Sequence, residues 1–98
     1  MDLSMAIPTV TVLFPHALRV KVGGQGSVVA AGRTVREIID ALERDFPGMR
    51  FNLCYETGEL RPFVNIFLDR DNIRFLQGLD TAVYAGATMR ILQSVAGG

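Results

Sequence analysis

Two segments near the start of the chain predict β-strands, and the first of them alternates its side chains in the way a half-buried strand does. Residues 9–14 are rich in β-branched side chains and end at Pro15, which has no N–H to donate to a sheet. Residues 27–31 form a second such segment, closed by Gly32. The apolar and cationic stretch 18–22 and a glycine-rich turn lie between them. The pattern predicts a β-hairpin with an elaborate connection.

The clearest helical period of the chain covers residues 35–46. Its apolar side chains recur at i, i+3, i+4, i+7 and i+11, at Val35, Ile38, Ile39, Leu42 and Phe46. Thr34 and Glu37 form a capping-box pair, in which each side chain satisfies a backbone donor left free at the helix start. Pro47 and Gly48 end the helix. We therefore expect one amphipathic helix that covers one face of a sheet.

The second half of the chain shows strand patterns but no second sustained helical period. Residues 49–60 predict a loop with at most one irregular turn, and the strongly apolar residues 63–68 predict a strand. The elements expected after that strand are a turn at 69–72, the start of a returning strand at 73–75, a loop with a helical turn at 77–83 and a final strand at 88–92.

This order of elements, β-β-α-β-β-β, predicts an α+β fold of the β-grasp (ubiquitin-like) type. In such a fold a mixed sheet of about five strands carries one main helix, and the first and last strands lie parallel at its centre. We expect residues 1–92 to form this domain and residues 93–98 to form a flexible C-terminal tail ending in Gly-Gly.

Composition narrows the classes of function. The 98 residues fit one domain, and 49% hydrophobic with 20% charged residues excludes a disordered or fibrous chain. Ten Lys and Arg balance ten Asp and Glu, so the clustered cations of a dedicated nucleic-acid binder are not expected. The start of the chain lacks the cationic segment of a secretory signal, and its apolar stretch is too short to span a bilayer. We expect a cytoplasmic protein with no nucleic-acid or membrane partner.

The sequence lacks the combinations of residues that most kinds of catalytic site require. The only histidine, His16, stands beside Pro15 in an expected loop, which favours a solvated or locally hydrogen-bonded side chain. The only cysteine, Cys54, has no signature of a base with it, which favours a buried thiol over a nucleophile. Asp69 and Asp71 fall in an expected turn, where aspartate is chosen for backbone reasons. We expect no metal site on this chain.

The chain ends in Gly97 and Gly98, which is unusual because glycine makes up about 7% of ordinary chains. One interpretation is a frayed terminus, since glycine gives the backbone the most freedom. The other is a carboxylate on a thin arm. Without Cβ atoms such an arm can enter a narrow active site, where the Gly98 carboxylate could attack the α-phosphate of ATP. Composition leaves both interpretations open.

A set of short segments, spread over almost the whole chain, occurs together in one known family. The segments are residues 10–14, Leu18-Arg19, Thr34 at the helix start, residues 63–66 and residues 95–98. With them the chain resembles the ubiquitin-like sulfur carriers of the MoaD/ThiS family. The second half, from Phe63 to the end, is most similar to the CysO-type carriers of an alternative route of cysteine biosynthesis. The chain departs from the family pattern at 69–72 and 93–94, which bears on the pathway more than on the family.

The resemblance implies a protein co-substrate and not an enzyme. A partner adenylyltransferase/sulfurtransferase of the ubiquitin-activating type would adenylate Gly98, and a sulfur donor would displace AMP to leave a thiocarboxylate. In the cysteine route, that sulfur would attack an aminoacrylate held on pyridoxal phosphate by a partner cysteine synthase. This chain would bind no cofactor itself, since ATP and pyridoxal phosphate would belong to the partner enzymes.

The family also docks on its partners through an apolar sheet face beside the tail. By position, Leu68 and Leu92 are the candidates for that patch, and Val95 and Ala96 lead from it to Gly97 and the reactive terminus. Other functions stay open. They are the small subunit of molybdopterin synthase, a carrier for thiamine, tRNA thiolation or a thio-siderophore, a protein modifier that forms an isopeptide with a lysine, and a plain β-grasp interaction module.

Overall fold

The computed structural model describes residues 6–94, and every element named below lies in that range. The strands are β1 (Thr9–Leu13), β2 (Ser27–Ala31), β3 (Val64–Leu68), β4 (Asp71–Asn72) and β5 (Thr88–Gln93). The α-helices are α1 (His16–Arg19), α2 (Val35–Asp45) and α3 (Met49–Leu53), and short 3-10 turns are η2 (Val20–Val22), η3 (Ile73–Phe75) and η4 (Gly78–Asp80).

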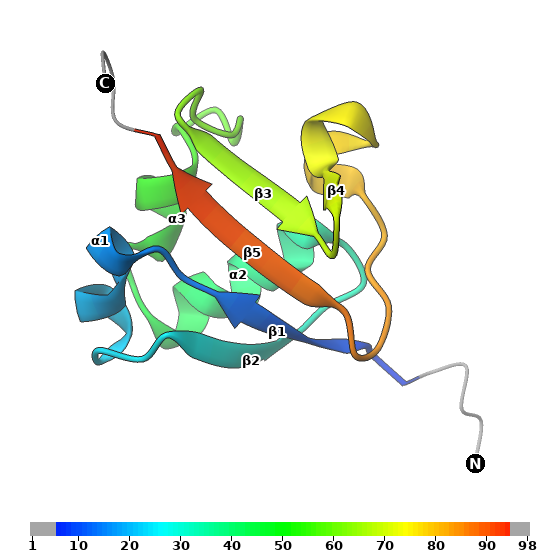
Figure 1. Ribbon diagram of the computed structural model, residues 1–98, viewed down its shortest axis with the longest axis horizontal. Coiled ribbons are helices and arrows are strands. Elements are labelled where there is room, and N and C mark those ends of the chain that lie inside the picture. Colours follow the sequence, from blue (N-terminus) through cyan, green and yellow to red (C-terminus); the bar gives the residue numbers. More distant parts are fainter. Residues whose placement is uncertain (1–5, 95–98) are drawn as a thin grey trace.

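Within residues 6–94, five strands form one mixed sheet in the order β2-β1-β5-β3-β4, with α2 and α3 behind it in the view of Figure 1. β1 and β5 are parallel neighbours, and the other three pairs are antiparallel. The predicted β-grasp fold, with its first and last strands parallel at the centre, is confirmed. β5 lies between β1 and β3, and it is paired with β1 over residues 88–90 and with β3 over residues 89–93, so its C-terminal end is held by β3.

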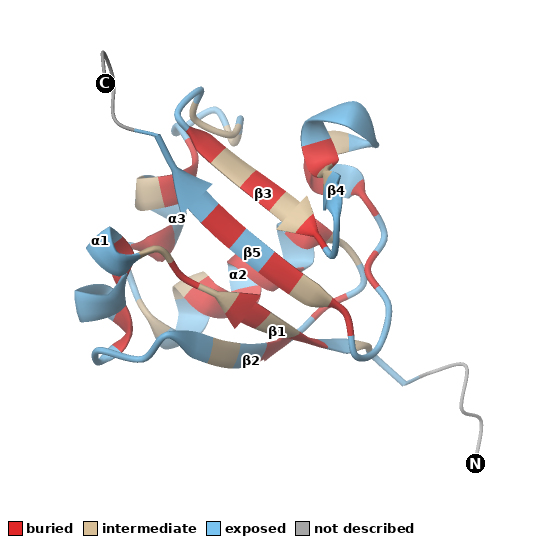
Figure 2. Cartoon of the chain, viewed as in Figure 1, coloured by how far each residue is buried: buried red, intermediate tan, exposed pale blue. Residues whose placement is uncertain are grey.

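Alternation along the strands decides which side chains enter the core. In β1, Val10 and Val12 are buried while Thr9 and Thr11 face the other side of the sheet. The same period of two runs along β3 and much of β5, where buried and more exposed positions alternate in Figure 2. The core therefore lies between the inner face of the sheet and the helices, and the outer face is left to solvent.

Helix α2 forms as its sequence predicts. The Thr34 hydroxyl oxygen accepts from the Glu37 N–H at 3.2 Å, and the Glu37 carboxylate accepts from the Arg33 N–H at 2.9 Å, one residue before the expected capping-box donor. The apolar stripe that faces the sheet is Val35, Ile38, Ile39 and Leu42, all buried. Phe46 follows the helix as its C-cap and packs partly buried against the core.

Two short helices lie where the sequence predicts irregular chain. α1 and η2 replace the expected connection of the first hairpin, and α3 replaces the expected loop. Each buries one pair of apolar side chains four residues apart, Leu18 with Val22 and Met49 with Leu53. A single such pair is too short a pattern to show a helical period, so only packing against the core reveals these helices.

The return after β3 also differs from the prediction. β4 covers only Asp71 and Asn72, and residues 73–75 form the 3-10 turn η3 in place of a strand. A 3-10 turn forms here in place of a strand because the Asn72 side chain accepts from the Arg74 N–H at 3.0 Å and so caps a helical turn.

Candidate functional site at the end of the last strand

The C-terminal end of β5 is the point from which the diglycine terminus extends. β5 runs one residue beyond its predicted end, to Gln93. The next residue, Ser94, donates its N–H to the carbonyl oxygen of Phe63 at 2.8 Å. The four candidate residues Val95, Ala96, Gly97 and Gly98 lie outside the described residues, so their roles stay predictions. The site can be built only up to Ser94.

Arg74 holds the segment that carries the Phe63 acceptor. Its guanidinium donates to the carbonyl oxygens of Arg61 at 2.8 Å and Val64 at 2.6 Å, and its Nε donates to Oδ1 of Asn65 at 3.3 Å. Phe63 lies inside this bracketed segment and accepts the last backbone hydrogen bond of the described chain. Arg74 thus fixes the position of the acceptor at the base of the C-terminal segment. No local sequence pattern indicates this role, because the side chain acts on residues about ten positions away.

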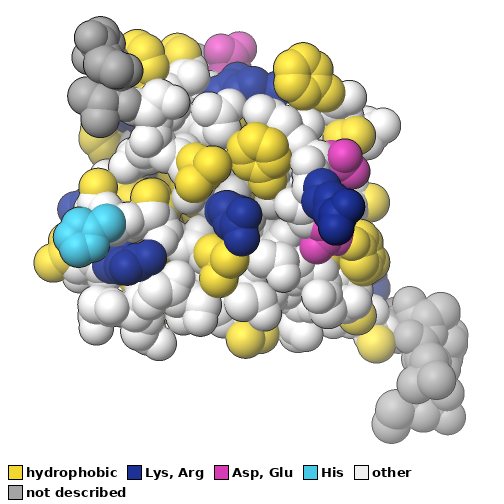
Figure 3. Space-filling model, in the orientation of Figure 1, with side chains coloured by type: hydrophobic (Ala, Val, Ile, Leu, Met, Phe, Trp, Pro, Cys, Tyr) yellow, Lys and Arg dark blue, Asp and Glu magenta, His cyan; other side chains and the backbone are white. Residues whose placement is uncertain are grey.

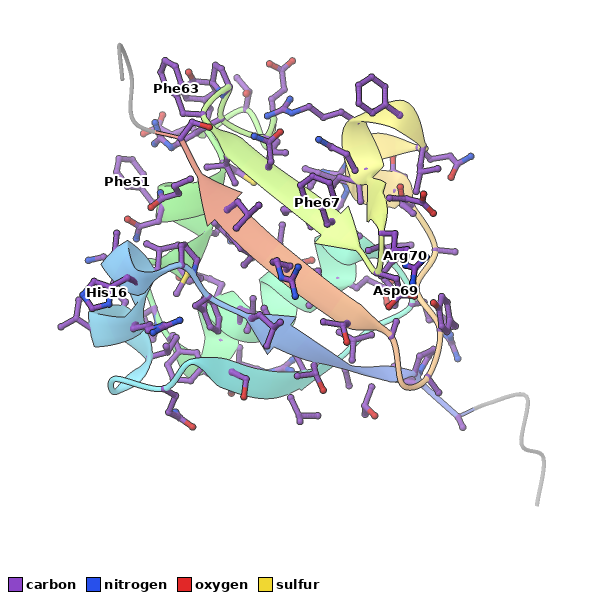
Figure 4. All side chains as sticks on the ribbon, in the orientation of Figure 1. His16, Phe51, Phe63, Phe67, Asp69 and Arg70 are labelled. Atoms are coloured by element: carbon purple, nitrogen blue, oxygen red, sulfur yellow. The ribbon has the colours of Figure 1, made fainter. Side chains whose placement is uncertain are left out.

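We call the point where the chain leaves β5, at Ser94, the exit. The outer face of the sheet beside the exit carries apolar side chains, and Leu92 is one of them, as expected for the predicted docking patch. Leu92 is 43% exposed and stands opposite Asn65 of β3. Phe67 lies on the same face of β3, beside Arg90 of β5. In the space-filling view hydrophobic and cationic side chains share the middle of this face (Figure 3), and Figure 4 labels Phe67 there.

The prediction for Leu68 is wrong, because this side chain does not reach the outer face. Leu68 is 6% exposed and belongs to the core together with Val64 and Ile66. These three positions share one face of β3, and the neighbouring position, Phe67, points to the other. A shift of one residue along a strand exchanges the two faces. Counting the alternation from Val64 would have identified Phe67 as the surface residue.

The residues set aside on chemical grounds occupy structural positions. Cys54 is 3% exposed, and burial raises the pKa of its thiol, which disfavours the nucleophilic thiolate at neutral pH. His16 is exposed at the start of α1. Asp69 has the one positive φ, 54°, of the described non-glycine residues, and its carboxylate accepts from the Thr88 N–H at 3.0 Å. That contact confirms a backbone role for Asp69 in the β3–β4 turn.

Two negative findings apply to residues 6–94. No group of three or more His, Cys, Asp or Glu side chains in that range is placed to hold a metal ion. No helix in that range is long and apolar enough to cross a membrane.

Comparison with known proteins identifies the family. The ThiS family model matches residues 12–98, which run from the last two residues of β1 through the rest of the scaffold to the diglycine terminus. The chain belongs to the ThiS family. In this member of the ThiS family the β-grasp sheet is the scaffold, and its strand β5 leads to the C-terminus.

Individual relatives agree with this assignment. Sulfur carrier protein CysO of Mycobacterium tuberculosis is 42% identical over 91 residues, which is 91% of this chain and 98% of that protein. A chain of the crystal structure of the Amycolatopsis orientalis BexX/CysO complex matches with a TM-score of 0.85 at 43% identity, over 91% of this chain and 99% of that one. Small archaeal modifier protein 3 of Haloferax volcanii is 32% identical over 80% of this chain and 87% of that protein. The predicted similarity to CysO-type carriers is confirmed.

Proposed function

We propose that this chain is a sulfur carrier that delivers sulfur from a thiocarboxylate on Gly98, and that the receiving pathway is cysteine biosynthesis. The observation that carries the proposal is the 42% identity to the Mycobacterium tuberculosis sulfur carrier protein CysO over 98% of that protein. The architecture supports it, since the central strand β5, which is paired with β3 as far as Gln93, presents Ser94 four residues before the terminal glycine.

The proposed chemistry begins with two steps on a partner enzyme. A carboxylate oxygen of Gly98 attacks the α-phosphorus of ATP, pyrophosphate leaves, and the carbonyl carbon becomes part of a mixed anhydride with AMP. Hydrosulfide then attacks that carbon, a C–S bond forms, the C–O bond to AMP breaks, and one proton is released. Activation is needed because AMP is a far better leaving group than the oxide of a free carboxylate.

Transfer takes place on a second partner. The thiocarboxylate is anionic at neutral pH, and its sulfur would add to the β-carbon of an aminoacrylate that a pyridoxal-phosphate cysteine synthase holds, with a proton taken up at the α-carbon. The product would be joined to Gly98 through its acyl group, and cleavage of that acyl link by water would release the sulfur-containing product and restore the Gly98 carboxylate. ATP and pyridoxal phosphate are bound by the partners in this scheme. The chain itself is a co-substrate and needs no nucleophile of its own, which suits a cysteine buried in the core.

Docking is assigned to the outer sheet face beside the exit. Leu92 is the central contact, and Phe67 takes the place proposed for Leu68, because it is the apolar β3 side chain on that face. Val95 and Ala96 then connect this contact to the diglycine terminus. Apolar area of this kind supplies the core of a docking contact, so the zero net charge of the chain is no obstacle.

The proposal is tested by incubating the purified chain with ATP, sulfide and an adenylating enzyme of the ubiquitin-activating type, followed by intact-mass measurement. We expect a mass gain that corresponds to one oxygen replaced by sulfur. Deletion of Gly98 abolishes the gain, and Gly97→Val blocks it by adding a branched Cβ in a narrow slot. A normal gain in either variant would refute the proposed role of the terminus.

A second candidate is a protein modifier, which the similarity to Haloferax volcanii small archaeal modifier protein 3 favours. In that case the ε-amino group of a target lysine attacks the Gly98 acyl-adenylate, AMP leaves and an isopeptide forms. Cell lysates would then contain high-mass conjugates of this chain that disappear when Gly98 is deleted. Their absence, together with a thiocarboxylate in the isolated protein, decides for the carrier.

A further inference from the structure

Aromatic side chains are exposed on the helix side of the chain exit. Phe51 of α3 is 64% exposed, Tyr55 after α3 is 42% exposed and Phe63 before β3 is 52% exposed. Arg61 lies against two of these rings, with its guanidinium carbon 4.7 Å from the ring centroids of both Phe51 and Tyr55, and Phe63 is two residues further along the chain. We call these four residues the aromatic ridge. Figure 4 labels Phe51 and Phe63 at the end of the molecule where β5 terminates.

The ridge is held in place before any partner binds. The Arg61 Nε donates to the carbonyl oxygen of Phe51 at 2.8 Å, and its backbone N–H donates to the carbonyl oxygen of Leu53 at 2.9 Å. The guanidinium also contacts both ring faces as a cation–π pair. A preorganised aromatic surface loses little conformational freedom on binding, which is why such surfaces serve as anchors in interfaces.

The ridge is not needed to fill the core. Its three rings are exposed, whereas the side chain of Leu53, on the other face of α3, is fully buried. Single exposed apolar residues are ordinary on protein surfaces, but aromatic rings gathered around an arginine have the composition of an interface hot spot. A shallow groove runs between the rings and Arg61 and has Glu56 and Glu59 at its margin. Both signs of charge occur there, so a partner would be selected by shape and apolar area.

The short stretch of chain between Ser94 and Gly98 indicates which kind of partner covers the aromatic ridge. Ser94 is hydrogen-bonded to Phe63, and Gly98 is four residues further on. Four residues span at most about 14 Å even when fully extended. An enzyme that encloses the Gly98 carboxylate must therefore bring the rim of its active site within that distance of Ser94. Phe63 is already in contact with Ser94 through its backbone, and Arg61 is two residues away.

Recognition must also come from outside the terminus, since Gly97 and Gly98 have no side chains to be read. We propose that the aromatic ridge docks on an apolar rim of the adenylating enzyme and so selects this chain for activation. This inference rests on the proposed function. The enzyme would then contact the domain on both sides of the exit, at Leu92 on the sheet face and at the ridge on the helix side.

The test compares Phe51→Ala with Tyr84→Ala as a matched control. Tyr84 is 54% exposed and lies before β5, whereas the exit follows β5, so roughly 20 Å of strand separates them. We expect Phe51→Ala to raise the KM for this chain in thiocarboxylate formation about tenfold with kcat unchanged. Arg61→Ala should do the same, because it removes the group that orders both rings. Tyr84→Ala should leave both constants within about twofold of wild type.

A second measurement is independent of folding changes. A photo-crosslinking amino acid placed at position 51 should capture the adenylating enzyme, and the same amino acid at position 84 should not. Equal KM values for Phe51→Ala and Tyr84→Ala, or equal crosslinking at both positions, would overturn the inference. An effect of Phe51→Ala on the sulfur-accepting enzyme alone would also overturn it. If wild type itself forms no thiocarboxylate, the proposed function fails and not the ridge in particular.

Discussion

Replacing Arg74 by alanine removes the side chain that fixes the base of the C-terminal segment. The wild-type guanidinium donates to the carbonyl oxygens of Arg61 and Val64 at 2.8 and 2.6 Å. Between those two residues lies Phe63, whose carbonyl oxygen accepts from the Ser94 N–H. In the alanine variant these acceptors must be satisfied by water, and the segment that carries them loses its only side-chain link to η3 among the hydrogen bonds of the described residues.

The expected size of the effect follows from the bonds that are lost. A hydrogen bond contributes about 0.5–1.5 kcal/mol net, so two short ones at a largely exposed site suggest a loss of about 1–2 kcal/mol in the free energy of unfolding. For a chain of 98 residues this lowers Tm by about 5–10 °C. If Arg74 acts on the exit in particular, amide exchange at Ser94 should also accelerate by about 5–30-fold.

Thermal unfolding followed by circular dichroism measures the first quantity, and amide hydrogen exchange by NMR measures the second. Arg70→Ala is the matched control, because Arg70 is an exposed arginine of the neighbouring β3–β4 turn. Arg74→Lys keeps the charge but lacks the planar fork, so it should restore only part of the protection. Unchanged exchange at Ser94 in Arg74→Ala, with or without a fall in Tm, would show that Arg74 does not position the exit.

Three further predictions concern the scaffold. Ile39→Ala, at a position 2% exposed, should lower the free energy of unfolding by about 2–5 kcal/mol in urea denaturation, and a loss under 1 kcal/mol would contradict its place in the core. The N–H groups of Gly48 and then Arg50 lower the pKa of Glu43 below its ordinary value of 4.5, so its stabilisation is present above that pH and is lost as pH falls through the lower folded value. The Tm of Glu43→Gln should therefore lie below wild type at neutral pH and converge with it in acid, and a constant difference would refute the assignment. Burial raises the pKa of Cys54, so native protein should react with iodoacetamide far more slowly than protein in urea, and equal rates would show that the thiol is exposed.

Part of the candidate site could be predicted from the sequence and part could not. Leu92, which the family resemblance indicated as a docking residue by its position, is exposed on the surface as expected. The prediction for Leu68 was wrong, since an error of one position in a period of two moves a side chain to the opposite face, and its neighbour Phe67 is the surface residue. The roles of Arg74 and of Phe51 had no local signal at all, because each depends on contacts with residues nine or more positions away.

By itself the sequence determined the strands β1, β2, β3 and β5, the helix α2 with its Thr34 cap, and the diglycine terminus. These features depend on periodicity and on backbone donors within a few residues, so neighbouring side chains are sufficient to specify them. Only the tertiary structure decided that Arg74 braces the acceptor of Ser94 and that Arg61 holds Phe51 near the segment that carries this acceptor. The reason is that such contacts join segments far apart in the chain, and their geometry exists only once the whole sheet has formed.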